Sequence, residues 1–207
     1  MDKRSVLFLS GVGTQPSDRL AEAHGNLPLL WQILLAGGAP ASALAGGSPR
    51  LVSDADAALL RLRCVVDFMA RHPAVLARPP LGWAFDGVLA SLRDRLAGKP
   101  GRYFTAELDA LSWMSDSAPA GFIDECRADC NARWRIIAEA IAARDHLALS
   151  RALYLDDPDD WRYWGATFGF ATLADPYFNR LRALPDAPHP LAPRPRRSSW
   201  WRWFTPG

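Results

Sequence analysis

Cysteines, histidines and long apolar runs are scarce in this sequence, and each shortage excludes a class of protein. The 207-residue chain has three cysteines and four histidines. The cysteine number is odd, and Cys126 and Cys130 stand four residues apart within one helical pattern. Such spacing does not suit a disulfide framework and favours a reducing compartment. We therefore expect a cytoplasmic protein.

No stretch of the chain is long and apolar enough to predict a membrane helix. Val6–Leu9 is too short for the core of a signal peptide. The uncharged stretch Ala23–Pro49 has its dense apolar part at Leu27–Ala36. That part is about half of the roughly 20 residues that a membrane span needs. Pro40 and two Gly-Gly pairs interrupt the remainder.

Recognisable catalytic motifs are also missing. The run that ends in Ser10-Gly11 resembles the oxyanion-loop region of α/β-hydrolases, but no G-x-S-x-G elbow occurs in the chain. The G-x-G at this point lacks the further residues of a dinucleotide or phosphate loop. The histidines are scattered singly, so Cys126 and Cys130 are expected in the core rather than at a metal. We expect no enzyme, no metal and no cofactor.

The net charge of +2 is too small to indicate a partner, but its distribution is uneven. From Arg180 onward six arginines accompany one aspartate, so this end carries +5 and the rest of the chain −3. The body is therefore mildly acidic and the end basic. So few positive charges in a short tail make nucleic-acid binding a minor alternative.

Apolar residues recur at helical spacing along most of the chain. This spacing predicts a helical turn at 17–23 and helices at 27–36, from Ser53 to Pro73, at 81–96, from Thr105 to Met114, at 120–145 and at 147–155. Ser53 and Thr105 are expected to be N-caps. A single buried strand is expected at Arg4–Ser10. The sequence thus predicts a mainly α fold, with roughly six or seven helices in one domain and a short N-terminal strand or small sheet.

Residues 1–184 are expected to form the helical domain, and residues 185–207 a proline-rich connector and an aromatic tail. Five of the eleven residues 185–195 are proline, which favours an extended chain. The basic tail beyond them contains Trp200, Trp201, Trp203 and Phe204. It can pack on the domain, enter a groove of a partner, or contact nucleic acid or membrane, and the sequence leaves these open.

A cluster of acidic and aromatic side chains forms the candidate partner-binding site. Its members are Asp156, Asp157, Asp159, Asp160, Trp161 and Trp164. The sequence Asp157-Pro158-Asp159-Asp160 is typical of a helix start, and capping alone accounts for three of these acids. The functional interpretation adds Asp156, Trp161 and Trp164, and the whole cluster then forms an acidic and aromatic surface that suits a basic protein partner.

Two segments near the amino terminus carry a resemblance to a known family. Arg4-Ser5-x-Leu7-Phe8 is followed by Leu27-Pro28-Leu29-Leu30-Trp31-x-x-Leu34-Leu35-x-Gly37, and then by the helix start at Ser53. This order, with Asp160-Trp161 and Phe168-Gly169 further on, resembles a family of uncharacterised bacterial cytoplasmic proteins of immunity type. The resemblance implies a protein that neutralises an interbacterial toxin by direct binding, and it supplies no catalytic residues.

We therefore expect a cytoplasmic immunity or antitoxin-like protein whose partner is a toxin or effector domain. A structural or adaptor subunit of a bacterial or phage assembly is the main alternative. An enzyme of unfamiliar chemistry is a further one.

Overall fold

The computed structural model describes residues 5–11, 16–23, 27–41, 50–73, 81–97, 103–108, 119–153 and 169–170. The elements follow in the order β1 (Ser5–Ser10), β2 (Pro16–Ala23), α1 (Leu29–Leu35), β3 (Ala39–Ala41), β4 (Arg50–Asp54), α2 (Ala55–Arg71), α3 (Leu81–Leu96), β5 (Tyr103–Glu107), α5 (Pro119–Ala142) and α6 (His146–Ala152). The part of the chain that the structure describes is thus an α+β fold.

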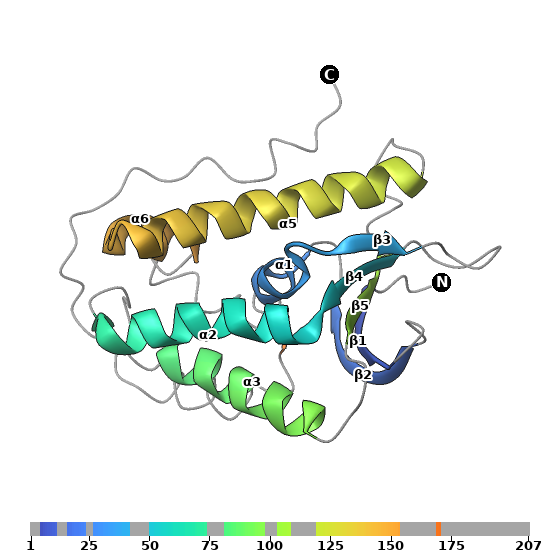
Figure 1. The fold of residues 1–207 in the computed structure, drawn as a ribbon, viewed down its shortest axis with the longest axis horizontal. Coiled ribbons are helices and arrows are strands. Elements are labelled where there is room, and N and C mark those ends of the chain that lie inside the picture. The colour runs from blue at the N-terminus through green and yellow to red at the C-terminus, as the bar shows by residue number, and fades with distance from the viewer. Residues whose placement is uncertain are drawn as a thin grey trace.

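The five strands form one antiparallel sheet in the order β2-β1-β5-β4-β3. Strands β1 and β2 pair as neighbours in sequence, and so do β3 and β4. Strand β5 lies between these two pairs, with Phe104 opposite Leu9 of β1 and Ser53 of β4. The central strand is therefore the last of the described strands in the sequence (Figure 1).

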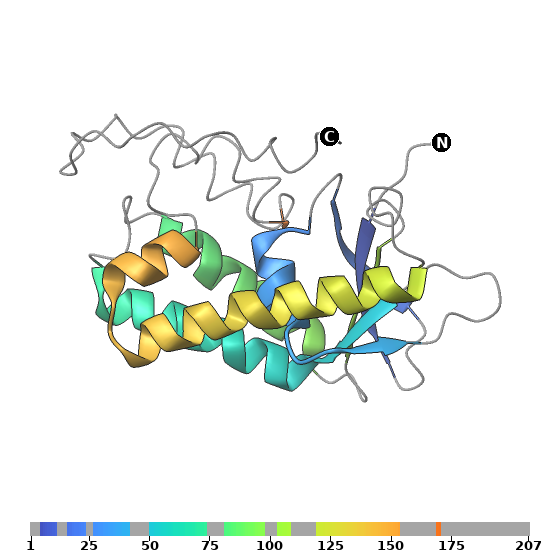
Figure 2. The ribbon, with the colours of Figure 1, turned by 90° about the horizontal axis from the view of Figure 1, so that it is seen from above.

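Helices α1, α2 and α5 lie against the same face of the sheet (Figures 1 and 2). The short helix α1 lies between α2 and α5 and contacts both. Helix α3 packs on α2, and α6 packs on α5. Six of the seven residues of α1 are buried, so this helix forms the centre of the core.

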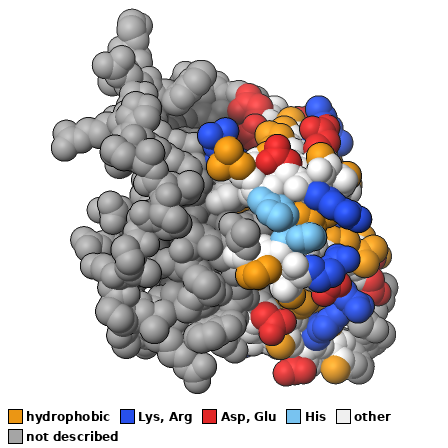
Figure 3. All heavy atoms as spheres, turned by 90° about the vertical axis from the view of Figure 1, so that its left-hand side faces the viewer, with side chains coloured by type: hydrophobic (Ala, Val, Ile, Leu, Met, Phe, Trp, Pro, Cys, Tyr) orange, Lys and Arg blue, Asp and Glu red, His pale blue; other side chains and the backbone are white. Residues whose placement is uncertain are grey.

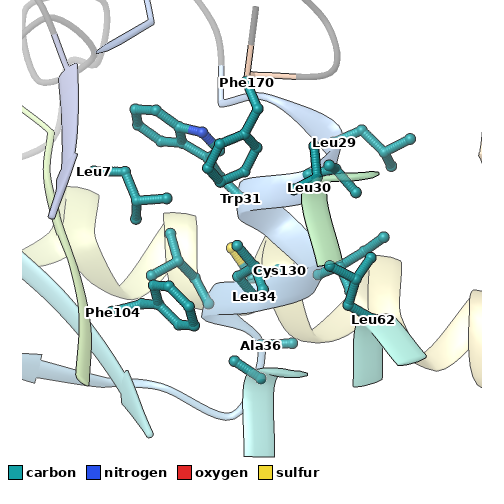
Figure 4. Close-up of a cluster of buried hydrophobic side chains, with 14 of the residues drawn as sticks. Leu7, Leu29, Leu30, Trp31, Leu34, Ala36, Leu62, Phe104, Cys130 and Phe170 are labelled. Carbon is teal, nitrogen blue, oxygen red and sulfur yellow. The ribbon is translucent and has the colours of Figure 1, made fainter. Parts of the chain in front are cut away.

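Alternate strand residues point into this core. Leu7 and Leu9 of β1 and Phe104 of β5 are buried on the face that the helices cover. Figure 4 shows Leu7 and Phe104 approaching the side chains of α1. Trp31 is fully buried, and its indole Nε1 donates a hydrogen bond of 2.9 Å to the carbonyl oxygen of Gly169. Gly169 has φ +85°, and a Cβ there would collide with Pro28 and Trp31, so this position requires glycine.

The carboxyl end of α1 is held by an arginine from α2. Arg61 donates hydrogen bonds to the carbonyl oxygens of Ile33 (2.9 Å) and Leu34 (2.8 Å), and to the hydroxyl of Ser53 (3.0 Å). The last carbonyls of a helix have no partner within the helix, so these bonds satisfy acceptors that would otherwise be orphaned. Gly37 then reverses the chain with φ +72°.

The predicted fold class is wrong. Five helices and a five-stranded sheet occur within the described ranges, rather than six or seven helices with a short strand. Residues 17–23 belong to β2 and not to a helical turn, and Thr105 lies in the centre of β5 and caps no helix. Strands β2 and β5 each contain residues that favour helices. Pairing with β1 overrides that propensity, because strand pairing also buries the inward-facing side chains.

The helix start near residue 53 is displaced by one residue. Ser53 belongs to β4, and Asp54 is the N-cap of α2, its carboxylate accepting a hydrogen bond of 2.8 Å from the Ala57 N–H. The predicted strand at Arg4–Ser10 and the predicted helices at 27–36, 81–96 and 120–145 are confirmed with small shifts of their ends. The expected domain limit at 184 lies outside the described residues. None of the helices in the described ranges is both long and apolar enough to cross a membrane.

Candidate functional site

The acidic and aromatic cluster predicted as the partner-binding site lies outside the described residues. This holds for all six of its members: Asp156, Asp157, Asp159, Asp160, Trp161 and Trp164. Their role stays a prediction.

Ser10, the serine of the hydrolase-like turn, is a buried structural residue. Its hydroxyl donates a hydrogen bond of 2.8 Å to Oγ1 of Thr105 on the neighbouring strand. Ser10 is 2% exposed and Thr105 is completely buried. The described histidines, His72 and His146, lie where α2 ends and α6 begins, at the end of the molecule away from the sheet (Figure 1). The described residues therefore place no imidazole beside the Ser10 hydroxyl.

The cysteines of α5 belong to the core, as predicted. Cys126 and Cys130 are buried beside Ile123 and Ile137 on one side of the helix. Burial, with the nearby Asp129 and Glu125, raises the pKa of the Cys126 thiol to about 12. Burial also raises the pKa of Cys130. Both thiols are protonated at neutral pH and are poor nucleophiles and metal ligands. Within the described ranges no group of three or more His, Cys, Asp or Glu side chains is arranged to hold a metal ion.

The opposite side of α5 is the candidate functional surface. Its amino-terminal half exposes three acids, Asp124, Glu125 and Asp129. The small residues Ala128 and Ala132 follow on the same side, and they lead to Ile136, which is 49% exposed. We call the exposed residues Asp124, Glu125, Ala128, Asp129, Ala132 and Ile136 the outer face of α5.

The charges on this face are crowded. Asp124 forms an ion pair of 3.0 Å with Arg127. Desolvation and, next, the negative charge of Glu125 raise the pKa of the Asp129 carboxyl, and Arg133 opposes them incompletely. A raised carboxyl pKa means that the surroundings disfavour the ionised form. A cation supplied from outside would relieve that repulsion.

The inner side of α5 is anchored to the rest of the fold. Asn131 accepts a hydrogen bond of 2.7 Å from the N–H of Gly37. Arg133 donates to the side-chain oxygen of Gln32 on α1 and to the carbonyl oxygen of Ala152 on α6, each at 3.3 Å. These contacts join α5 to three other parts of the chain, so its outer face stands on a fixed support.

The helical pattern at 120–145 is predicted from the sequence, but Ile136 is not singled out. The signal was present, because Ile137 continues the buried stripe and its neighbour must then face another direction on a helix. Comparison of the chain with protein-family models, with curated proteins and with solved structures found no match.

Proposed function

We propose that this protein binds a toxin or effector domain and neutralises it by occlusion, as immunity proteins do, and that the outer face of α5 is part of the contact surface. The observation that carries the proposal is Ile136, a large aliphatic side chain half-exposed beside small residues and crowded acids on an anchored helix. The resemblance of the segments at residues 4–8 and 27–37 to immunity-type proteins supports a toxin as the partner class.

A partner with a basic surface fits this face for two reasons. Desolvation raises the Asp129 pKa most and the charge of Glu125 adds to it, so positive charge near both carboxylates would relieve the second of these effects. Full burial of an aliphatic side chain contributes about 1.5–3 kcal/mol, and Ile136 has about half of that still to gain. Charge would then speed association, while apolar burial would slow dissociation.

The test begins with the reading frame that neighbours this gene, co-expressed with it at graded ratios. Occlusion predicts that growth is restored when about one copy of this protein is present per copy of the toxin. Rescue at far lower ratios would indicate turnover and would contradict the proposal. A stable complex with no effect on toxicity would instead favour an adaptor subunit.

Point variants test the surface with a matched control. Ile136→Ala and Asp129→Asn should each weaken binding about tenfold in a calorimetric titration. Leu60→Ala is the control, because Leu60 is a still more exposed aliphatic residue, 62% exposed, on α2. It should change the affinity less than twofold. Equal effects of Ile136→Ala and Leu60→Ala would remove the outer face of α5 from the interface.

A further inference from the structure

Two imidazoles meet at the end of the molecule farthest from the sheet. His72 follows the last residue of α2, and His146 is the first residue of α6. Their ring centroids lie 4.8 Å apart, and Phe68 contacts both rings at 4.4 Å and 5.8 Å. Both histidines are partly exposed. Figure 3 shows the two histidine side chains next to each other on the surface, with basic side chains beside them.

Two arginines from different parts of the chain act on this pair. Arg71 precedes His72 on α2, and Arg144 lies in the turn between α5 and α6. We call Arg71, His72, Arg144 and His146 the basic cluster. Burial and then the charges of His146, Arg71 and Arg144 lower the pKa of His72. No carboxylate contributes to that shift, so His72 stands in a positive field.

The carboxylates near the basic cluster form other contacts. The Asp145 carboxylate caps α6 by accepting a hydrogen bond of 2.9 Å from the Ala148 N–H. The Asp67 carboxylate pairs with Arg63 at 3.4 Å. Among the described residues, Arg144 has no ion pair, and the side chain of Arg71 donates only to the carbonyl oxygen of Asp67 at 2.9 Å. The cationic groups of the cluster therefore keep donors free for an anion.

Arg144 has an unusual backbone conformation at the end of α5. The Asp145 N–H donates to the Ala140 carbonyl (2.9 Å) and the Arg144 N–H to the Ile141 carbonyl (3.1 Å). This is the Schellman ending of a helix, in which glycine usually occupies the left-handed position. Arg144 occupies it here with φ 53°. Side chains other than glycine and asparagine are disfavoured there, and backbone strain of this kind is concentrated at functional sites.

We propose that the basic cluster is a docking site for the carboxylate side chains of an acidic segment of a partner protein. A protein segment fits better than nucleic acid, because Leu147, 46% exposed, directly follows His146 in the sequence, and only two permanent charges are present. This proposal depends on the proposed function in one respect only, namely that the ligand is a protein. The site binds more tightly at acidic pH, because protonation of His72 adds a positive charge that a bound carboxylate stabilises.

The probe is a fluorescein-labelled peptide of eight residues, rich in glutamate with one leucine, titrated with the full chain and followed by fluorescence anisotropy. Binding should tighten about tenfold from pH 7.5 to pH 5.5. It should weaken between 50 mM and 300 mM sodium chloride, as expected for exposed charges. In the variant His72→Gln with His146→Gln, the pH effect should fall below twofold.

Arg144→Asn separates binding from folding, since asparagine tolerates the left-handed conformation and carries no charge. It should leave Tm unchanged or raise it by about 2–4 °C, while weakening peptide binding about fivefold. Arg151→Ala is the matched control, because Arg151 is an exposed arginine of α6 outside the cluster. It should leave peptide binding unchanged.

The proposal is overturned if Arg144→Asn binds the peptide as the unmodified protein does, or if the double histidine variant keeps the full pH effect. A single-stranded oligonucleotide that binds more tightly than the peptide, and loses binding in the same variants, would also overturn it. The assay needs no toxin, so its outcome is independent of the variants on the outer face of α5. Loss of toxin neutralisation with normal peptide binding, or the reverse, distinguishes the two proposals.

Discussion

Replacing Arg61 by methionine tests whether a side chain of α2 is what completes the central helix. Methionine retains much of the apolar stem of arginine and removes all its donors. The hydrogen bonds to the carbonyls of Ile33 and Leu34 and to the Ser53 hydroxyl are then lost together. Helix α1 is only seven residues long and has no basic residue in its own last turn, so these carbonyls have no substitute donor from that helix.

The magnitude follows from the kind of bond that is lost. A hydrogen bond from a charged donor contributes about 1.5–3 kcal/mol to stability. Burial lowers the Arg61 pKa, so part of this gain offsets the cost of desolvating the guanidinium, and that cost disappears in the variant. We expect a net loss of about 2–4 kcal/mol. For a chain of this size that loss lowers Tm by about 4–16 °C.

Urea unfolding followed by circular dichroism measures this loss. Arg63→Met is the control, since Arg63 is an exposed arginine of the same helix in an ion pair of 3.4 Å with Asp67. Such a pair contributes about 0–1 kcal/mol. A loss below about 1 kcal/mol for Arg61→Met, or one equal to that of the control, would refute the argument that Arg61 holds α1 in place.

Three further outcomes are expected. A thiol reagent should label the exposed Cys64 in the native protein and should reach the buried Cys126 and Cys130 only after unfolding. Fast labelling of more than one thiol would contradict the assignment of Cys126 and Cys130 to the core. Ser10→Ala should cost about 1–2 kcal/mol by leaving the Thr105 hydroxyl buried without its donor, and adding Thr105→Val should recover part of that loss, whereas simply additive losses would argue against the bond. Because the pKa of His72 is lower in the folded protein than in the unfolded chain, stability should be complete above about pH 7 and decline as the pH falls through the folded pKa; urea midpoints at pH 7.5 and pH 5 should therefore differ less in His72→Gln than in the unmodified protein.

Sequence periodicity located the helices that have a wide apolar side. Helix α2 buries Leu62, Val65 and Met69 at spacings of three and four, and such a repeat is visible without knowledge of its partner. Periodicity failed for β2, whose sequence contains several residues that also suit helices, and for β5, a strand of only five residues. What makes them strands is their partners, and the partners of β5 are many residues away in the sequence.

Of the two candidate surfaces, one follows from the sequence pattern and the other does not. The solvent-facing acids of α5 follow from helical spacing alone, since the buried stripe determines which side remains outside. The meeting of His72 with His146 follows only from the docking of α6 beside the end of α2. No local pattern in the sequence connects two single histidines that belong to different helices. Sites assembled from separate elements are therefore the ones that single-sequence reasoning misses.

The late position of β5 in the sequence has a consequence for how the chain folds during synthesis. The pairs β1–β2 and β3–β4 can form locally, but only β5 joins them into one sheet. Loop closure over such a distance is slow, and exposed strand edges promote association between incomplete chains. A nascent chain that has not yet released Tyr103–Glu107 from the ribosome presents two unjoined hairpins. Ribosome-bound fragments ending before β5 should therefore be digested by protease, and resistance should rise abruptly once that strand has emerged.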